Sequence, residues 1–537
     1  MAIGPMVEEV AYKVCILAAG RGSRLEDLTE HVNKALIPIA YKPVLSHILE
    51  NVPTDVEVII AVGYRKELIE QFAQLCYGDR KISLVDVGRY QGPGSGPGYS
   101  LLKCKELLQC PFVVTTCDTM VLEKVPRPDV NWMGVAHADN IEDFCSVTIN
   151  GDKITKLHYK EKVWANDAFI GIAGVRDYQR FWDTLEHNQQ LIEGEVQLAN
   201  GLAGLTEPEM YPVRFTWFDT GDRESLQRTG EHFGETINLD KDSEFIYFLG
   251  PDVVKFFPDP EWVSKRVQRG RLLGDLCPEI VGVTRNFYKY RKVAGQELAG
   301  IVDDKLCQEF LEWSDKNLWK PVELQGDELE EFYSVCRKFY RDKTLDRLYQ
   351  FYASTGLRDG ADVINGNRVP ALAELLDRID WSYVAQGIPA RFHGDFHFDN
   401  VIVSTDKARN QAFCLLDWRQ DFGGIIEYGD LYYDLSKMYH ALTIAHEAIK
   451  ADRFYVNQSK EGISFDFWIN HRLISCRYIL ENYIVERGLD LHKVRLLTNL
   501  IFLNMSPLHQ HPFNLLLYYM GKLGLHKLTC DGSYADR

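Results

Sequence analysis

The stretch from Val14 to Leu25 constrains this chain most: a short apolar strand runs directly into a glycine-rich turn that carries two arginines. Backbone N–H groups in such a turn, together with the arginines, can surround the phosphates of a nucleotide. A glycine turn alone is equally consistent with an ordinary strand-to-helix connection. Because Lys34 adds a further cation, we expect a nucleotide site. The residues expected to form it are Ala18, Gly20, Gly22, Ser23, Arg24 and Lys34.

Length and charge limit the classes of protein to consider. At 537 residues the chain is longer than one hydrophobic core normally supports, so at least two domains are expected. A formal charge of −17 argues against nucleic acid as a partner, because an acidic surface repels phosphate backbones. No apolar run approaches the roughly 20 residues that cross a bilayer, and the chain does not start like a signal peptide. A cytoplasmic protein without membrane contact is therefore expected.

The twelve cysteines include no Cys-x-x-Cys pair, which argues against a zinc site and against a disulfide framework. Within the first 220 residues, short apolar runs rich in β-branched residues alternate with amphipathic segments. This pattern predicts an α/β, Rossmann-like domain with a mainly parallel sheet, whose ligand lies at the carboxyl ends of the strands. The predicted strands are Val14–Leu17, Val56–Val62, Ile82–Val87 and Phe112–Thr116, and the predicted helices are Pro43–Asn51 and Lys66–Cys76.

Asp118 follows the last of these strands. A buried charge at such a position costs several kcal/mol unless it is paired or coordinates a metal. The glycine turn, Arg24 and Lys34 together resemble the signature of the sugar-phosphate nucleotidyltransferases, which include glucose-1-phosphate thymidylyltransferase and bacterial phosphocholine cytidylyltransferase. This chain has Asn33 where that family usually has proline, a change that affects loop stiffness more than charge.

The resemblance implies that Asp118 is the first Mg²⁺ ligand and that Asp219, in a Trp-x-Asp-x-Gly element, is the second. It also implies that Lys162, in a Glu-Lys pair, holds the acceptor's phosphate, and that Glu195 contacts the acceptor's hydroxyl groups. Taken singly, Asp219 is equally consistent with a turn or cap residue, and the lysine and the glutamate with solvated surface.

The segment 92–100 has six glycines or prolines in close succession and lies between a predicted strand and a predicted helix. Glycine lets the backbone approach a ligand closely, and the resemblance implies that Gly94 and Gly96 help to hold the nucleotide base. The alternative is a flexible surface loop.

The pattern changes near residue 235. Glu244–Phe257 predicts a β-hairpin, Trp262–Leu276 a basic helix and Asn286–Val293 a further strand, and mostly helix follows from Leu329. This order predicts a small β-lobe followed by a larger helical lobe. The expected domains are residues 12–232 and residues 238–537.

The second domain contains a His-Gly-Asp-Phe-His-Phe-Asp-Asn motif followed by a strand that ends in aspartate. Phosphoryl transfer requires an aspartate that orients a hydroxyl group and accepts its proton, and an asparagine and a second aspartate that hold Mg²⁺ on ATP. The motif resembles the aminoglycoside phosphotransferase and choline kinase superfamily, which has the two-lobed, α+β protein-kinase fold. The resemblance implies that Asp395 is the catalytic base, that Asn400 and Asp417 bind Mg²⁺, and that Lys255 contacts the ATP phosphates.

Three other residues of this region have supporting roles by the same resemblance. Asp434, in a Tyr-Asp-Leu run, is expected to steady the catalytic loop, and His393 to brace it, whereas His397 is expected to be a structural histidine. Two departures weaken the assignment of Lys255: the basic helix has no mid-helix glutamate, and residues 236–243 match a glycine-rich phosphate lid poorly.

These features predict a bifunctional enzyme with Mg²⁺ at both sites. One half phosphorylates a small alcohol, with a sugar or polyol favoured, using ATP. The other transfers a nucleoside monophosphate from CTP or UTP to the phosphomonoester, releasing pyrophosphate and giving an NDP-activated product. One alternative is choline or another amino alcohol, bound by an aromatic cage; another is a nucleotide-binding metabolite sensor with a degenerate kinase lobe. The candidate cage residues are Trp381, Trp418, Tyr428 and Tyr432.

Overall fold

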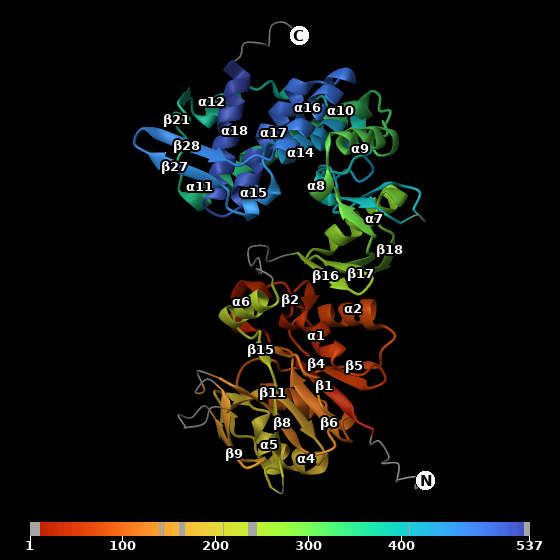
Figure 1. Ribbon diagram of the computed structural model, residues 1–537, viewed down its shortest axis with the longest axis vertical. Coiled ribbons are helices and arrows are strands. Elements are labelled where there is room, and N and C mark those ends of the chain that lie inside the picture. Colours follow the sequence, from red (N-terminus) through yellow and green to blue (C-terminus); the bar gives the residue numbers. More distant parts are fainter. Residues whose placement is uncertain are drawn as a thin grey trace. The chain divides into compact units, whose positions relative to one another are not determined.

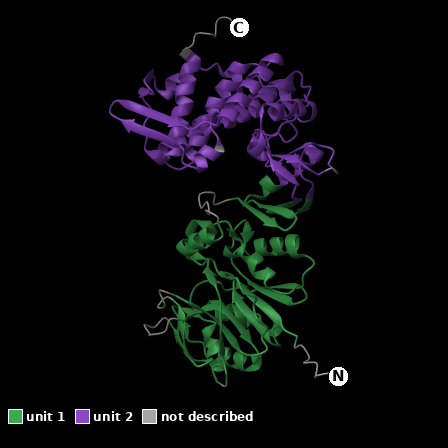
Figure 2. Ribbon diagram, in the orientation of Figure 1, with its two compact units in different colours: residues 1–263, 281–290 green, residues 264–280, 291–537 purple. Residues whose placement is uncertain are grey.

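The computed structural model describes residues 11–138, 141, 144–159, 167–207, 209–234, 244–406 and 409–530 (Figure 1). The chain forms two compact units (Figure 2). The first comprises residues 1–263 and 281–290, and the second comprises residues 264–280 and 291–537. The hairpin predicted for the kinase half thus packs with the first unit. The two units are defined by packing, whereas the ranges 12–232 and 238–537 are assigned from sequence patterns. Those ranges therefore remain a prediction.

The first unit is organised around β1 (Lys13–Ala18), which pairs in parallel with β4 (Glu57–Val62) on one side and β6 (Phe112–Thr116) on the other. A further parallel strand, β5 (Ile82–Asp86), lies next to β4. All four strands fall where the apolar runs predict them. Alternate residues of β1 belong to different hydrophobic clusters, with Ile16 in one and Leu17 in the other. Both faces of the sheet are therefore covered, as parallel sheets require.

Five further strands extend the sheet to nine, in the order β10-β9-β11-β6-β1-β4-β5, with β8 paired antiparallel to β11 and parallel to β14. The added strands are β8 (Trp132–His137), β9 (Cys145–Asn150), β10 (Lys153–Tyr159), β11 (Asp167–Val175) and β14 (Tyr211–Arg214). The helices of this unit are α1 (Val44–Glu50), α2 (Lys66–Tyr77), α3 (Pro97–Lys103), α4 (Tyr178–His187), α5 (Ala199–Leu202) and α6 (Arg223–His232). The expected α/β fold with a mainly parallel central part is confirmed.

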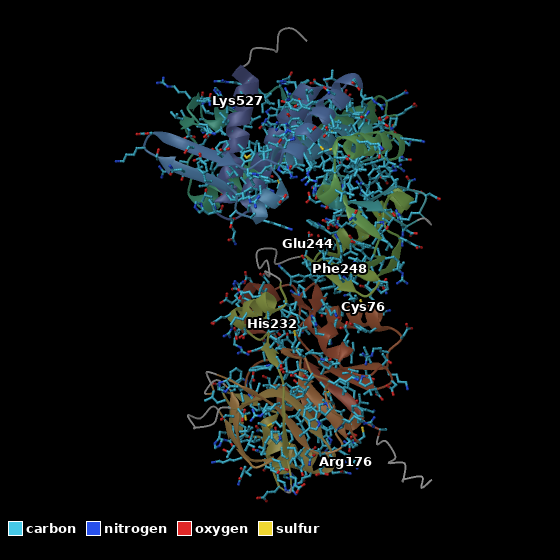
Figure 3. All side chains as sticks on the ribbon, viewed as in Figure 1. Cys76, Arg176, His232, Glu244, Phe248 and Lys527 are labelled. Carbon is cyan, nitrogen blue, oxygen red and sulfur yellow. The ribbon has the colours of Figure 1, made fainter. Side chains whose placement is uncertain are left out.

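A small four-stranded sheet follows, in the order β16-β17-β19-β18. Its strands are β16 (Phe245–Leu249), β17 (Asp252–Phe256), β18 (Ile280–Val283) and β19 (Phe287–Arg291). Tyr247 donates its hydroxyl hydrogen to Leu36 O at 2.8 Å, and the Phe72 ring of α2 lies 5.7 Å from the Tyr247 ring. The N–H of Phe248 donates to Tyr41 O at 2.8 Å, and Cys76, at the end of α2, packs against the same core (Figure 3). These contacts explain why the hairpin belongs to the first unit.

The second unit is mainly helical. Its longest helices are α7 (Pro260–Leu273), α9 (Asp304–Asn317), α10 (Asp327–Arg337), α11 (Lys343–Thr355), α14 (Leu431–Thr443), α16 (His471–Glu486), α17 (Leu491–Met505) and α18 (Phe513–Cys530). Shorter ones are α8 (Leu298–Ile301), α12 (Leu372–Asp377), α13 (Trp381–Ala385) and α15 (His446–Lys450). The catalytic loop is followed by β24 (Val401–Ser404), which pairs with β20 (Gly295–Glu297) on one side and with β25 (Phe413–Leu415) on the other. None of the helices within the described ranges is both long and apolar enough to span a bilayer.

The expectation of mostly helix after Leu329 misses a four-stranded sheet. Strands β21 (Asp362–Ile364), β22 (Asn367–Val369), β27 (Phe454–Ser459) and β28 (Gly462–Phe467) form it in the order β22-β21-β28-β27. Most of their residues are partly or fully exposed, so they lack the continuous apolar runs by which the buried strands of the first unit are recognised.

Candidate active sites

In the first unit, a lysine and an aspartate from distant parts of the sequence form an ion pair. Lys34 Nζ lies 2.6 Å from Asp118 Oδ2, and the two side chains are 16% and 18% exposed. Burial alone would raise the pKa of Asp118, but the positive charge of Lys34 outweighs it and lowers that pKa to about 2. Burial would lower the pKa of Lys34, but the negative charge of Asp118 raises it above the usual value. Both groups are therefore charged at neutral pH.

Asn33 fixes the loop that carries Lys34. Its side-chain Nδ2 donates to Ala18 O at 3.0 Å and to Tyr64 O at 2.7 Å, and its Oδ1 accepts from the N–H of Ala35 at 2.9 Å. The residue is fully buried. The departure from the proline of the resembling family therefore replaces a stiff ring with three hydrogen bonds that attach the loop to the end of β1.

Gly22 lies against the same lysine. Its φ of +71° is in the left-handed region, and a Cβ there would lie 3.2 Å from Lys34 Cβ and 3.3 Å from Thr29 Cγ2. A side chain at this position would displace the lysine. Ser23 begins the short helix η1 (Ser23–Thr29) directly after this turn, and Arg24 is exposed. At Gly20 a Cβ would meet open space, as the nucleotide hypothesis requires of the turn.

The second carboxylate comes from strand β15 (Trp217–Asp219), which pairs antiparallel with β7 (Thr119–Val121) and so lies beside Asp118. Burial, followed by the negative charge of Asp118, raises the pKa of Asp219 to about 6. The N–H of Gly221 donates to Asp219 Oδ1 at 2.8 Å. Two neighbouring carboxylates, one of which is held partly neutral by the charge of the other, are a fitting pair of ligands for a divalent cation.

Gly221 marks the point where three predicted site residues meet. A Cβ at this glycine would lie 3.0 Å from Asp219 Oδ1, 3.1 Å from Arg24 Nη2 and 3.4 Å from Asp118 Oδ2. The structure therefore brings Arg24, Asp118 and Asp219 together from three separate segments, with Lys34 paired to one of them. A cation between the carboxylates and an anion at the arginine would share this place.

The glycine-rich loop packs against β13 (Glu195–Val196). The N–H of Gly94 donates to Gly194 O at 2.8 Å, and the N–H of Val196 donates to Ser95 O at 2.8 Å. At Gly96, where φ is +115°, a Cβ would lie 2.7 Å from Val196 O. Glycine at position 96 is thus explained by the approach of β13, a reason that sequence analysis missed. The contact places Gly94 and Gly96 next to the exposed Glu195, and their roles toward ligands remain predictions. Lys162 lies outside the described residues.

In the second unit, Asp434 holds the catalytic loop by its backbone. Its Oδ2 accepts from the N–H of His393 at 2.7 Å, and its Oδ1 accepts from the N–H of Gly394 at 2.6 Å. Trp319 Nε1 donates to Oδ2 as well, at 3.1 Å. Burial raises the pKa of Asp434 to about 6 despite these hydrogen bonds. This is the steadying role expected for the Tyr-Asp-Leu run.

His393 connects this loop to the segment before Asp417. Its Nδ1 accepts from the N–H of Asp395 at 3.2 Å, so Nε2 carries the hydrogen and donates to Leu416 O at 2.7 Å. Burial lowers the pKa of His393 to about 3. The ring is therefore a neutral brace, as expected.

Asp395 accepts from several donors. Lys437 Nζ lies 2.7 Å from its Oδ1, and His397 Nε2 lies 3.5 Å from its Oδ2. Burial would raise its pKa, but the charges of Lys437 and His397 hold that pKa well below its usual value. His397 Nδ1 also lies 3.3 Å from Asp399 Oδ2. Burial would lower the pKa of His397, but Asp395 and Asp399 raise it to about 9. Lys437 and a charged His397 were both missed by sequence analysis, because neither motif spacing nor composition links them to Asp395.

The two predicted metal ligands of this half lie on neighbouring segments. Asn400 Nδ2 donates to Asp395 O at 2.9 Å, which directs the amide oxygen elsewhere and leaves it able to ligate a cation. The N–H of Leu416 donates to Asn400 O at 2.8 Å and so brings Asp417 next to it. Asp417 has a φ of +55°, a left-handed conformation that is uncommon for non-glycine residues. A carboxylate beside an amide oxygen fits Mg²⁺.

Lys255 lies on β17 and is 4% exposed. Its contact with ATP remains a prediction. The basic helix α7, which has no mid-helix glutamate, uses its cations differently. Arg266 Nη1 donates to Trp418 O at 3.0 Å, and the Arg269 guanidinium lies 3.9 Å from the centre of the Phe392 ring. These side chains brace the segments on either side of the catalytic motif.

Each of the four candidate cage residues has another partner within the fold. Trp418 is 1% exposed and donates its Nε1 hydrogen to Arg266 O at 2.8 Å. The Tyr432 ring lies 4.8 Å from Lys493 Nζ, so it already faces a cation of the chain. Trp381 donates its Nε1 hydrogen to Leu376 O, and Tyr428 packs against Phe332.

Two known families match different parts of the chain, and each match contains residues of one of the two sites. Residues 14–165 match the MobA-like NTP transferase domain, and residues 327–458 match the phosphotransferase enzyme family. The first match contains Lys34 and Asp118, and the second contains Asp395, Asn400 and Asp417. Two different transferase domains thus occur in one chain.

Curated relatives match the first half. The bifunctional protein GlmU of Methanococcus vannielii is 31% identical over 238 residues, which cover 41% of this chain and 55% of that protein. The choline-phosphate cytidylyltransferase of Streptococcus pneumoniae is 32% identical over 120 residues, 22% of this chain and 49% of that protein. The chain spans about half the length of these relatives. A solved UDP-glucose pyrophosphorylase from Acinetobacter baumanii is 14% identical with a TM-score of 0.35, and the match covers 42% of this chain and 93% of that one.

Proposed function

We propose that this chain, which joins a MobA-like NTP transferase domain to a phosphotransferase domain, is a bifunctional enzyme. The phosphotransferase half phosphorylates a small alcohol with ATP, and the nucleotidyltransferase half transfers a nucleoside monophosphate from CTP or UTP to the resulting ester. The observation that carries the proposal is the occurrence, in one chain, of two assembled carboxylate sites: Arg24, Asp118 and Asp219 around Gly221, and Asp395 with its cations. A kinase forms a phosphomonoester and a nucleotidyltransferase of this kind consumes one.

In nucleotidyl transfer, a phosphate oxygen of the acceptor attacks the α-phosphorus of the nucleotide in line, and pyrophosphate leaves with the bonding electron pair. Arg24 and Lys34 supply positive charge where negative charge develops, and the bond between Lys34 and Asp118 holds the lysine ready. Asp118 and Asp219 would hold Mg²⁺, which supplies charge neutralisation on the phosphates when bound. Asn33 keeps the loop of Lys34 in place.

In phosphoryl transfer, Asp395 accepts a hydrogen bond from the alcohol, whose oxygen attacks the γ-phosphorus of ATP while ADP leaves. The alcohol's proton passes to Asp395 as the new bond forms. Its lowered pKa makes Asp395 a weak base, so orientation of the hydroxyl group is its main contribution. Asn400 and Asp417 would hold the Mg²⁺ ion, and Lys255 would contact the ATP phosphates.

A sugar or polyol is the favoured acceptor, and choline or another amino alcohol is the alternative. The buried position of Trp418 and the cation already facing Tyr432 support the first, because a quaternary ammonium group needs exposed aromatic faces. The choline-phosphate cytidylyltransferase among the relatives supports the alternative. A protein that only binds nucleotides is the remaining candidate.

The test uses the full chain with Mg²⁺, ATP and a panel of alcohols. We expect ADP and one phosphomonoester from alcohol and ATP alone. Addition of CTP or UTP is expected to convert that ester to a nucleotide-diphospho product with release of pyrophosphate. ³¹P NMR and mass spectrometry identify both products. Nucleotide binding without turnover of any alcohol would favour the sensor. If the ester forms but the nucleotidyltransferase half does not use it with CTP, UTP, ATP, GTP or dTTP, the two halves act on different substrates.

A further inference from the structure

A group of four basic side chains lies near Asp395, and the function proposed above leaves most of it unused. Lys343 and Arg347 come from α11, Arg419 follows Asp417 by two residues, and Lys437 comes from α14. We call these four residues the cationic cluster. Lys437 is bonded to Asp395, and Lys343 Nζ and Arg419 Cζ lie 4.5 Å and 5.1 Å from the centre of the same Phe339 ring.

Local backbone structure places Lys343 there. The turn just before α11, Lys338–Asp342, has the wide π-helical form, which is rare and concentrated at functional sites. It is fixed by Tyr340, whose hydroxyl group donates to Asp430 Oδ2 at 2.7 Å in the core, and by Thr344 Oγ1, which donates to Tyr340 O at 2.6 Å. The wide turn places the Phe339 ring under Lys343, so both belong to one rigid unit.

Arg419 is held from the side of the catalytic loop. Its N–H donates to His393 O at 3.0 Å, and its Nε donates to Asp421 O at 3.0 Å. At Gly394 a Cβ would lie 2.5 Å from Arg419 Cβ, so the arginine packs directly on the loop that carries Asp395. A guanidinium stacked on aromatic rings keeps its outer N–H groups for a planar or tetrahedral anion.

The cluster is short of negative charge. Over the described part of the chain, neither Lys343 nor Arg419 forms an ion pair with a carboxylate, and Asp395 is already bonded to Lys437. Burial is the largest cause that lowers the pKa of Lys343 to about 6, followed by the positive charges of Arg419 and Lys437. Arg347 lowers it further. In a chain with a formal charge of −17, four basic side chains gathered beside a carboxylate can bind an anion, and a bound anion would favour the charged form of Lys343.

We propose that the alcohol phosphorylated at Asp395 carries a negatively charged group, a carboxylate or a phosphate, and that Lys343 and Arg419 bind this group while Asp395 receives the hydroxyl. The inference rests on the proposed kinase activity of the second half and names the class of its acceptor. Lys437 lies between the two functions, because it contacts Asp395 and belongs to the cluster. Choline and other amino alcohols are disfavoured by like-charge repulsion at this place.

The first test compares acceptors of similar size on the full chain with Mg²⁺ and ATP. Glycerol is the neutral probe, glycerate the carboxylate, glycerol 3-phosphate the phosphate and choline the cation. We expect kcat/KM for at least one anionic probe to exceed that for glycerol about 100-fold, the size of two charge-assisted hydrogen bonds. The better of the two anions identifies the group. Equal or better use of glycerol or choline would overturn the inference while leaving the kinase intact, whereas no ADP from any alcohol would refute the kinase itself.

Variants locate the effect. Lys343→Gln and Arg419→Gln are each expected to raise KM for the anionic acceptor about tenfold or more and to leave KM for ATP unchanged. Arg341→Gln, an exposed cation two residues before Lys343, is the matched control and is expected to change neither constant. A rise in KM for ATP alone would assign the cluster to the nucleotide and overturn the inference.

A second readout does not depend on turnover. A lysine with a lowered pKa reacts quickly with amine-reagents near neutral pH, so limited acetylation followed by mass spectrometry is expected to label Lys343 faster than the exposed Lys338. Glycerate, glycerol 3-phosphate or inorganic phosphate is expected to slow this labelling at least tenfold, and glycerol is not. Labelling that no anion slows would overturn the inference even if an acceptor for the kinase is found.

Discussion

Asp118 in the nucleotidyltransferase half and Asp395 in the phosphotransferase half each receive one lysine, Lys34 Nζ at 2.6 Å and Lys437 Nζ at 2.7 Å. Both carboxylates have lowered pKa values. Their surroundings differ in sign. Asp118 has a second carboxylate beside it, whereas Asp395 has additional cations.

The difference can be followed through one more residue at each site. Burial and the charge of Asp118 raise the pKa of Asp219 to about 6, while burial and the charges around Asp395 lower the pKa of Lys343 to about 6. Burial is the largest cause in both groups, and neighbouring like charges add to it: Asp118 at Asp219, and Arg419 and Lys437 at Lys343. A divalent cation at the two carboxylates would relieve the first repulsion, and an anion at Lys343 and Arg419 would relieve the second. Charge imbalance thus indicates what each site binds.

The largest expected effect comes from removal of a metal-ligand charge. Asp118→Asn is expected to lower nucleotidyl transfer about 100-fold or more and to leave phosphorylation of the alcohol unchanged, and Asp417→Asn is expected to do the reverse. Each removes one negative charge from a separate Mg²⁺ site. Pyrophosphate release and ADP formation, measured on the same preparation, separate the two. Near-normal activity of either variant in its own half-reaction would show that the wrong ligand has been chosen.

A smaller effect is expected from crowding the site around Gly221 without changing its charge. In Gly221→Ala the new methyl group would lie within 3.4 Å of Asp219, Arg24 and Asp118. We expect nucleotidyl transfer to fall about tenfold to 100-fold, because a displacement of about 1 Å at reacting groups has this size. Gly300→Ala, where a Cβ meets open space, is the control. An unchanged rate in Gly221→Ala would mean that the three side chains do not act together.

Asn33→Ala tests how the lysine of the first site is held. The substitution leaves Ala18 O, Tyr64 O and the N–H of Ala35 without a partner in a buried place, at a cost of about 2 kcal/mol in the free energy of unfolding of this half. Chemical denaturation measures the loss. Asn33 has a φ of −74°, which proline can adopt, so Asn33→Pro is expected to keep more nucleotidyl transfer than Asn33→Ala. Equal loss in both would show that the hydrogen bonds, and not loop stiffness, position Lys34.

Sequence analysis predicts the parts that depend on local pattern. The apolar strand Val14–Leu17, its glycine turn and the motif around Asp395 are contiguous, so period and spacing reveal them. Pairings between distant segments are different. Lys437 is 42 positions from Asp395, and Lys343 is 52 positions from it on the other side. Only the fold brings them together, so no spacing rule could indicate the charge imbalance.

The same limit applies to the glycines. The sequence attributes Gly96 to contact with a ligand, whereas the structure gives an internal reason, the approach of Val196 O. The basic helix α7 is a second case. Its lack of a glutamate is visible in the sequence, but the contacts of Arg266 and Arg269 with segments more than 100 residues away are not. Sequence analysis finds the residue types, and packing decides what each one contacts.

The smallest expected effect distinguishes the two sites most directly, because Asp219 and Lys343 titrate near the same pH with opposite consequences. Asp219 must lose a proton to bind Mg²⁺, so the apparent affinity for Mg²⁺ is expected to fall as the pH drops below about 6. Lys343 must gain a proton to bind an anion, so the affinity for an anionic acceptor is expected to fall as the pH rises above about 6. Each slope is at most tenfold per pH unit for one proton.

Both slopes can be measured on the full chain between pH 5.5 and 8, from the Mg²⁺ concentration that gives half-maximal pyrophosphate release and from KM for the anionic alcohol. Among the groups that face Lys343, Lys437 and Asp395 stay charged through their mutual bond, and arginine side chains in general keep their charge across this range. Because a phosphate monoester itself loses a proton near pH 6, the slope is measured with glycerate, whose carboxylate stays ionised, and it then reports Lys343. Lys343→Arg, which stays charged, is expected to abolish that slope and to leave the Mg²⁺ slope unchanged. If both affinities changed in the same direction with pH, the two sites would not differ in the sign of the charge that they lack.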